Sequence, residues 1–315
     1  MKNRRPLWRQ RLIAIVLIFM GAVMSVYPVV ENLYNDWRGS AVVDEYTQRI
    51  SAAPAPILES QQQAAEKYND ALTISALNDP WSDEQEATSP EHDAYVGELA
   101  GFGPLGRIRV PSVEIDLPIF HDATRRSLGL GAGHMYGTSL PIGGPGTHAV
   151  IAGHTGSTER TYFNRLNEVG EGTLFHIDTL GRTLTYRVDQ ITVVSMSDLS
   201  QIQPVEGADL VTLVTCIVGS SGERLLVRGV REPTSAADTA HGTDIEAAAQ
   251  VPAETPHAIQ RWMRPRLAIA AGALVLLFGM TITWLVSDAR AVPSVGAGLS
   301  EPAQPTGTKR EDAQV

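Results

Sequence analysis

The chain has 315 residues, a formal net charge of −10 and a single cysteine, Cys216. This acidic balance argues against a nucleic-acid-binding protein, which normally presents a basic face. One cysteine also excludes an intramolecular disulfide, so we expect the thiol to be either buried and inert or retained for its reactivity.

The chain begins with five basic residues in positions 1–11, followed by the uncharged run Leu12–Val30. A helix of this length can cross a hydrocarbon core of roughly 30 Å. The run is longer than the apolar part of a typical signal peptide, and no A-x-A cleavage site follows it closely. We therefore predict an uncleaved transmembrane helix over residues 12–30, with residues 1–11 in the cytoplasm.

A second uncharged run, Leu267–Val286, predicts another transmembrane helix over residues 267–286. A buried core helix is the alternative for either run. Arg261, Arg264 and Arg266 precede the second run on the side that this topology places outside the cell. The first span usually sets the orientation, and arginine side chains can reach the membrane interface, so we expect both termini in the cytoplasm.

Residues 31–97 carry apolar side chains at helical spacing, interrupted by the helix-breaking sequence AAPAP. An acidic stretch with two prolines, Asn78–Asp93, is typical of a loop. Trp81 is unusual there because a large indole needs something to cover it. Residues 233–266 have few large apolar side chains and predict a linker, and residues 287–315 predict a disordered tail.

Residues 98–232 contain short β-branched runs, often alternating with polar residues and separated by turn residues. Their spacing suits a closed or nearly closed β-barrel or a sandwich. Residues 159–172, ERTYFNRLNEVGEG, predict one short helix ended by glycine. This region is the part of the chain rich enough in strands to form a core.

Cys216 ends the predicted strand Asp209–Cys216, and a second predicted strand begins at Arg224. If the two strands pair antiparallel, Cys216 and Arg224 lie at the same edge of the sheet. Arg228 lies roughly 13 Å further along at about 3.3 Å per residue. An arginine beside a thiol can favour the thiolate or bind an oxyanion, although it can also simply cover a strand end.

A cysteine nucleophile normally requires a histidine as acid or base. Of the eight histidines, His154 directly follows the apolar strand HAVIAG and precedes a turn, so it can stand at a sheet edge. Position favours it, but position alone leaves the other histidines open.

The blocks TLVTC (212–216), RLLVRG (224–229) and HAVIAGHTG (148–156) resemble the sortases, cysteine transpeptidases of Gram-positive cell surfaces. The similarity covers residues 97–231 and is greatest to class C, the pilin-polymerising branch. The sequence DPW at 79–81 and the second apolar run behind the barrel also resemble that branch.

This resemblance implies a mainly β fold: an eight-stranded sortase barrel with short helices, an N-terminal helical and lid segment and two transmembrane helices. It implies that Cys216 is the nucleophile, that His154 is the general acid/base and that Arg224 stabilises the substrate or oxyanion. It also implies a lid in which Asp79 lies near Arg224 and Trp81 covers Cys216; a structural turn at this sequence is the alternative.

The resemblance further implies a catalytic domain outside the cell that cleaves an LPxTG-like signal between Thr and Gly. It would transfer the resulting acyl group to a lysine amine of a pilin, without cofactor or metal. A housekeeping sortase that uses a cell-wall precursor and a cysteine peptidase are the alternative enzymes. The chain departs from class C because the loop IVGSSGE lacks the usual T-P-Y start and the histidine before the arginine, and HTG stands where HRG is common.

Overall fold

The structure, a computed structural model, describes residues 7–72, 89–157, 161–195, 198, 200–220, 222–232 and 263–290. The chain divides into two compact units. One comprises residues 1–23 and 268–315, and the other comprises residues 24–267. Both apolar runs lie in helices, α1 (Leu7–Ala52) and α6 (Met263–Arg290).

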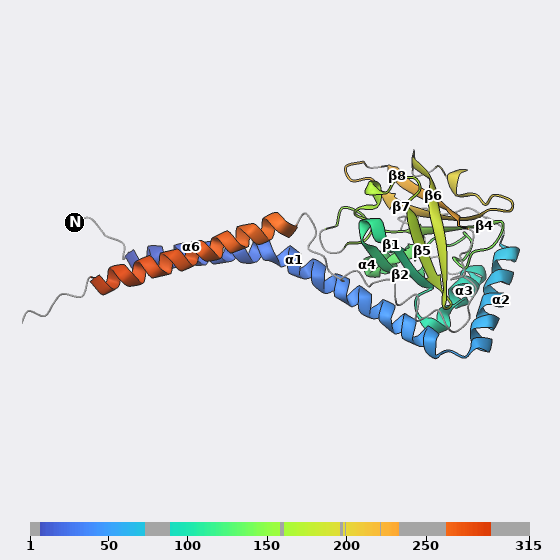
Figure 1. The fold of residues 1–315 in the computed structure, drawn as a ribbon, viewed down its shortest axis with the longest axis horizontal. Helices are drawn as coiled ribbons and strands as arrows, with labels where there is room; N and C mark the ends of the chain where they lie inside the picture. Colours follow the sequence, from blue (N-terminus) through green and yellow to red (C-terminus); the bar gives the residue numbers. More distant parts are fainter. Residues whose placement is uncertain are drawn as a thin grey trace, which may run out of the picture. The chain divides into compact units, whose positions relative to one another are not determined.

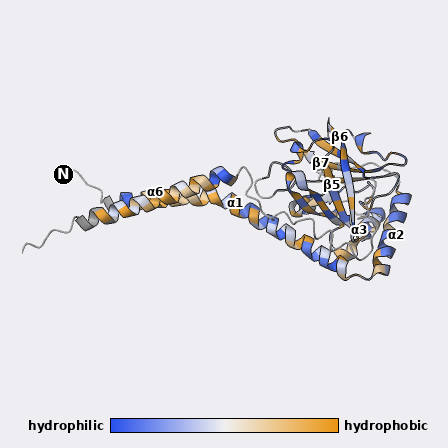
Figure 2. Cartoon of the chain, viewed as in Figure 1, coloured by the Kyte–Doolittle hydropathy of each residue, from blue (hydrophilic) through white to orange (hydrophobic). Residues whose placement is uncertain are grey.

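Each of these helices contains a window that is long and apolar enough to cross a membrane, within Arg9–Ala52 and Met263–Trp284. In Figure 2, α6 and the N-terminal part of α1 are mainly hydrophobic, whereas hydrophobic and hydrophilic residues alternate along the rest of α1. The helices are therefore compatible with membrane anchoring.

The proline-rich break predicted after α1 is confirmed. Helix α2 (Ala55–Ala71) begins after Pro54 and carries a second proline in its first turn. The predicted loop Asn78–Asp93 is partly wrong, because α3 (Pro90–Gly97) begins inside it. The Oγ of Ser89 accepts a hydrogen bond from the His92 amide and caps this helix. A serine directly before Pro90 is a signal for a helix start, but the acidic, proline-containing composition of the stretch favoured a loop.

The β region folds as a closed barrel of eight strands, so the barrel prediction is confirmed and the sandwich is excluded (Figure 1). The strand order around the barrel is β1-β2-β3-β4-β7-β8-β6-β5. The strands are β1 (Gly106–Val110), β2 (Ile115–His121), β3 (Ala132–His134), β4 (Thr147–Ala152), β5 (Leu174–Thr179), β6 (Arg182–Ser195), β7 (Asp209–Cys216) and β8 (Glu223–Arg231).

Alternating burial along the strands directs one set of side chains into the barrel, where they form the main hydrophobic core. Ile108, Ile151, Leu213 and Val227 belong to that core. A smaller cluster, which includes Val150, Val214 and Leu226, lies on the other face of β4, β7 and β8. Two apolar layers therefore fix the register of these three strands.

In the described part of the chain after α3, five short helical elements precede or connect the strands. They are η2 (Ala100–Phe102), η3 (Pro111–Val113), α4 (Arg125–Leu130), η4 (Leu166–Glu168) and η5 (Ser200–Ile202). The helix predicted over residues 159–172 is wrong: turns and the single 3₁₀ turn η4 occupy the described part of this segment. The Phe163 amide donates a hydrogen bond to the carbonyl of His154, nine residues earlier, which is a loop contact and not the i to i−4 contact of an α-helix.

Candidate functional site

Cys216 and Arg224 are directly paired residues of the antiparallel strands β7 and β8. Cys216 is the last residue of β7, and Arg224 is the second residue of β8. Cα atoms of such paired residues are about 4.5–5.5 Å apart. The pairing expected from the sequence is therefore confirmed, and both side chains lie at one end of the barrel.

His154 reaches the same end through strand β4, which pairs in parallel with β7. Ala152 is the register partner of Val214, and the amide of Gly153 donates a hydrogen bond to the carbonyl of Val214 at 3.0 Å. His154 lies two residues beyond Ala152, just as Cys216 lies two residues beyond Val214. The β4–β7 register therefore brings His154 and Cys216 to one rim of the barrel.

Strand alternation also places Cys216 and Arg224 on one face of the sheet. Cys216 shares the face of Val214, and Arg224 shares the face of Leu226; both apolar residues belong to the smaller cluster. Ala152 belongs to that cluster as well, and His154 follows it by two residues. Cys216 and Arg224 thus extend one common row at the end of this face, and His154 follows the end of β4 at the same rim.

The burial of the three residues differs. Cys216 is a partly exposed free thiol. Arg224 is only 8% exposed although it is charged, and its Nη1 donates a hydrogen bond to the carbonyl of Glu223 at 3.3 Å. A guanidinium held at the rim beside a thiol can stabilise negative charge on a reacting carbonyl oxygen.

The imidazole of His154 packs against the ring of Tyr162, with centroids 5.8 Å apart and planes at 81°. Burial lowers the pKa of His154 below its usual value, because an imidazolium is poorly solvated there. At pH 7 the ring is therefore mainly neutral and able to accept a proton.

The other histidines that the structure describes are engaged elsewhere. His148 bonds to the hydroxyl of Thr212 at 2.7 Å, and His134 lies fully buried between Tyr95 and the Ser139 carbonyl. His92, His121 and His176 bond to Asp122, the Glu98 carbonyl and Thr185, respectively. His241 and His257 lie outside the described residues.

Two residues beside the site were not predicted from the sequence. Thr215 is buried, and its hydroxyl donates a hydrogen bond to the carbonyl of Gly153 at 2.7 Å, which joins the strand of Cys216 to the loop of His154. Its place in the TLVTC block was an available signal. Tyr162 offered no signal, because its contact with His154 depends on the path of the loop.

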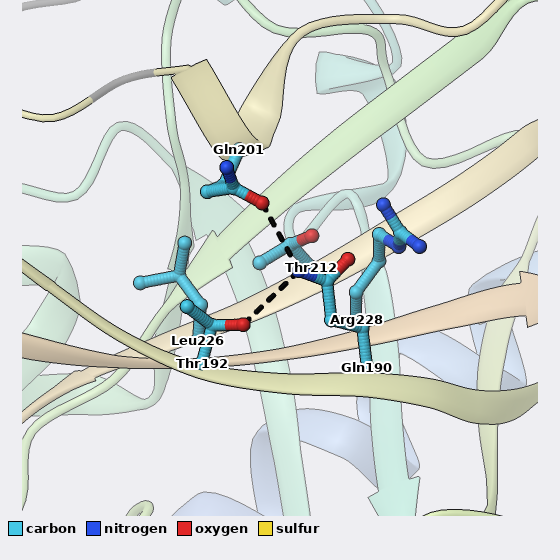
Figure 3. Close-up of a pocket in the computed structure, with 6 residues that line it drawn as sticks. All are labelled: Gln190, Thr192, Gln201, Thr212, Leu226 and Arg228. Carbon is cyan, nitrogen blue, oxygen red and sulfur yellow. Dashed lines mark hydrogen bonds between the residues drawn. The ribbon is translucent and has the colours of Figure 1, made fainter.

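A small pocket lies on the same face, and Thr212 in its lining is about 13 Å along β7 from Cys216 at about 3.3 Å per residue. Figure 3 shows its lining, in which the amide of Gln190 donates hydrogen bonds to Thr192 and Gln201 at 3.0 Å each. Its volume of about 10 Å³ suits roughly one water molecule and is far too small for a peptide. The predicted lid residues Asp79 and Trp81 lie outside the described residues.

Comparison with known proteins agrees with this geometry. The model of the sortase domain matches residues 108–232. Sortase A of Streptococcus agalactiae is 30% identical over 147 residues, which cover 45% of this chain and 59% of that protein. The alignment thus spans somewhat more than half the length of that curated relative.

Two solved structures are similar over almost their whole length. Sortase C-1 from Actinomyces oris is 41% identical, with 57% of this chain and 99% of that chain covered and a TM-score of 0.55. The pilus-related sortase C of Group B Streptococcus is 34% identical, with 61% and 97% covered and a TM-score of 0.56.

A closed eight-stranded barrel with cysteine, arginine and histidine at one rim defines a sortase-type fold. The chain belongs to the sortase family, whose members are cysteine transpeptidases, and these two structural matches are class C sortases.

Proposed function

We propose that this chain is a membrane-anchored cysteine transpeptidase that joins pilin subunits through an LPxTG-like sorting signal. The observation that carries this proposal is the placement of Cys216, Arg224 and His154 at one rim by the registers of β7 with β8 and with β4. An inert cysteine needs neither a directly paired, largely buried arginine nor an aligned histidine.

In the first half-reaction, the sulfur of Cys216 attacks the threonine carbonyl carbon of the sorting signal. His154, mainly neutral because burial lowers its pKa, accepts the thiol proton. Arg224 stabilises the negative charge that develops on the carbonyl oxygen. The bond between threonine and glycine then breaks, His154 returns the proton to the departing glycine amine, and a thioacyl enzyme remains.

In the second half-reaction, a lysine amine of another pilin subunit attacks the thioacyl carbon. His154 accepts a proton from the attacking amine, the carbon–sulfur bond breaks, and the thiolate of Cys216 regains a proton. The product is an isopeptide bond between two subunits. Atoms and charges balance without a cofactor.

The choice of a pilin as substrate rests on the solved matches, among them a pilus-related sortase C. The two apolar helices support a membrane anchor. By the sequence arguments, the catalytic domain would lie outside the cell and both termini inside. The segment containing Asp79 and Trp81 would form a lid, with the carboxylate near Arg224 and the indole over Cys216.

A housekeeping role is the second candidate, because sortase A proteins are among the curated relatives. In that role the acyl group would pass to an amine of a cell-wall precursor, and the substrates would be surface proteins.

The full chain in detergent micelles should be incubated with a purified pilin subunit that carries an LPxTG-like signal. We expect SDS-resistant ladders that Cys216→Ala abolishes and that are lost when the acceptor lysine of the pilin is replaced. Ligation to a small added amine without ladders would favour the housekeeping role. Hydrolysis alone, even with added amine, would indicate a cysteine peptidase and overturn the proposal.

A further inference from the structure

Hydrogen bonds join the two sides of the loop that carries His154. The amide of Phe163 donates to the His154 carbonyl at 2.9 Å. Ser157 and Asn164 exchange two hydrogen bonds, from the Ser157 amide to Oδ1 at 3.1 Å and from Nδ2 to the Ser157 carbonyl at 2.6 Å. The position of the imidazole therefore depends on what fixes residues 161–164.

Tyr162 is the residue of this segment that touches the imidazole, and its backbone is unusual. Its φ of 36° lies in the left-handed region, which non-glycine residues rarely occupy. Such a conformation persists only where the surroundings enforce it. One constraint is visible on the side chain, since the Tyr162 hydroxyl donates a hydrogen bond to the Gly129 carbonyl at 2.9 Å.

The second constraint comes from a helix that is 125 positions away in sequence. Asp36 of α1 accepts two hydrogen bonds from Thr161, one from the amide to Oδ1 at 3.2 Å and one from the hydroxyl to Oδ2 at 2.6 Å. Both carboxylate oxygens thus accept hydrogen bonds from the residue directly before Tyr162. Thr161 is only 8% exposed, so this contact is well shielded from water.

Asp36 lies six residues after Val30, the end of the apolar run in the same helix. At about 1.5 Å per residue, the carboxylate is about 9 Å along α1 from that run. The first helical turns after the apolar run therefore carry the group that holds the histidine loop.

We propose that Asp36 is a positioning residue for the catalytic histidine: through Thr161 and Tyr162, the anchor helix α1 holds His154 in register with Cys216. The inference rests on the proposed transfer reaction and names a group outside the barrel on which that reaction depends. Asp36 does not touch the substrate; it acts through the loop.

The test uses the full chain in detergent micelles and an LPxTG-like peptide with an added amine. Asp36→Ala should lower kcat by about 10- to 100-fold with KM changed less than twofold, since displacing a reacting group by about 1 Å can cost 10²-fold. Alkylation of the Cys216 thiolate by iodoacetamide at high pH should not change, because the thiol itself stays in place.

Glu45→Gln is the matched control on the same helix. Glu45 is exposed and pairs with Arg49 one turn further on, so removing its charge should leave kcat within twofold of the parent. An equal loss of kcat in both variants would overturn the proposal, because it would point to a general effect of charge on α1.

A second pair of variants keeps the test decisive if Asp36→Ala fails to fold. Thr161→Ser retains the hydroxyl and should keep most of the activity, whereas Thr161→Val retains the shape and should lose about 10-fold in kcat. NMR titration of the imidazole adds a readout besides activity: Asp36→Ala or Thr161→Val should shift the His154 resonances and raise its pKa toward 6.5 as the ring becomes more solvated.

Unchanged kcat and unchanged His154 resonances in a folded Asp36→Ala or Thr161→Val variant would disprove the positioning role. That result differs from failure of the proposed function, in which the parent chain itself would release no glycine product and would behave like Cys216→Ala.

Discussion

Cys216 and Arg224 occupy directly opposed positions at the loop end of the β7–β8 hairpin, and their side chains lie on the same face of the sheet. Arg224 is paired on both sides, with Cys216 of β7 and with Val194 of β6, so the ladders that close the barrel also fix this pair. Moving either residue by one position would turn its side chain to the opposite face.

This relationship predicts that Arg224 cannot be replaced by lysine without loss. Arg224→Ala should lower kcat/KM for an LPxTG-like peptide by about 10²–10³-fold, the usual effect of removing an oxyanion donor. Arg224→Lys keeps the charge but loses the planar fork of donors, so we expect a loss of at least about 10-fold. Steady-state kinetics with the peptide and an added amine provide the measurement.

Arg228→Lys is the control for this series, because Arg228 lies two rows further from the rim and forms an ion pair with Asp189. Its effect on kcat/KM should be within about threefold. Full activity of Arg224→Lys would show that a simple positive charge suffices at the rim.

Gly153 joins the strand of Cys216 to the loop of His154, and it leaves no room for a side chain. A Cβ atom there would lie 2.6 Å from the ring of Phe163, which is itself fully buried. Gly153→Ala should therefore displace the loop, with an overpacking cost of about 1–3 kcal/mol in unfolding free energy and a fall in kcat. Chemical unfolding followed by circular dichroism, together with kinetics, measures both effects.

Gly170→Ala is the matched control, because a Cβ at that exposed position meets nothing within 4 Å. Its stability and activity should equal those of the parent. If the two alanine variants were equally stable and active, the tight contact of Gly153 with Phe163 would have no part in placing His154.

The strands that could be predicted from the sequence are those with long β-branched runs, such as β6 and β7. Strand β3 could not be predicted, because it has three residues, Ala132–His134, two of them small, and its pairing with β2 and β4 is set by neighbours distant in sequence. Local propensity carries little information on such a strand.

The candidate site also contains residues that could be predicted from the sequence and residues that could not. Cys216 and Arg224 could be paired from sequence because one hairpin contains both. His154 could be favoured only by its place after a strand, since its alignment depends on the parallel β4–β7 register. The Asp36–Thr161 contact joins residues 125 positions apart and follows no periodicity, so no sequence pattern could have revealed it.

The proposed lid makes a prediction on thiol reactivity. If Trp81 covers Cys216 and Asp79 binds Arg224, either Asp79→Ala or Trp81→Ala should speed the labelling of Cys216 by a thiol reagent. A lid that is closed 99% of the time would give an increase of up to about 100-fold. Asp83→Ala, which removes another carboxylate of the same stretch, should leave the rate unchanged; equal rates in all variants would contradict a lid.

The buried histidine His134 predicts how stability depends on pH. Burial lowers its pKa to about 4, whereas an unfolded chain has a histidine pKa near 6.5. The unfolded state therefore binds a proton first as pH falls, so stability is fully present above about pH 6.5 and is lost between there and about pH 4. A difference of about 2.5 pH units corresponds to at most about 3.4 kcal/mol from this residue.

Burial lowers the pKa of His121 and of His148 as well, so their contributions have the same sign as that of His134. Urea unfolding of the full chain in micelles from pH 7.5 to pH 4 should show a falling free energy of unfolding. His134→Gln should unfold more easily at pH 7.5, because the hydrogen bonds to Tyr95 and the Ser139 carbonyl are weakened, but its stability should fall less steeply with acid. Parallel pH curves for parent and variant would show that His134 does not become charged on unfolding in this range.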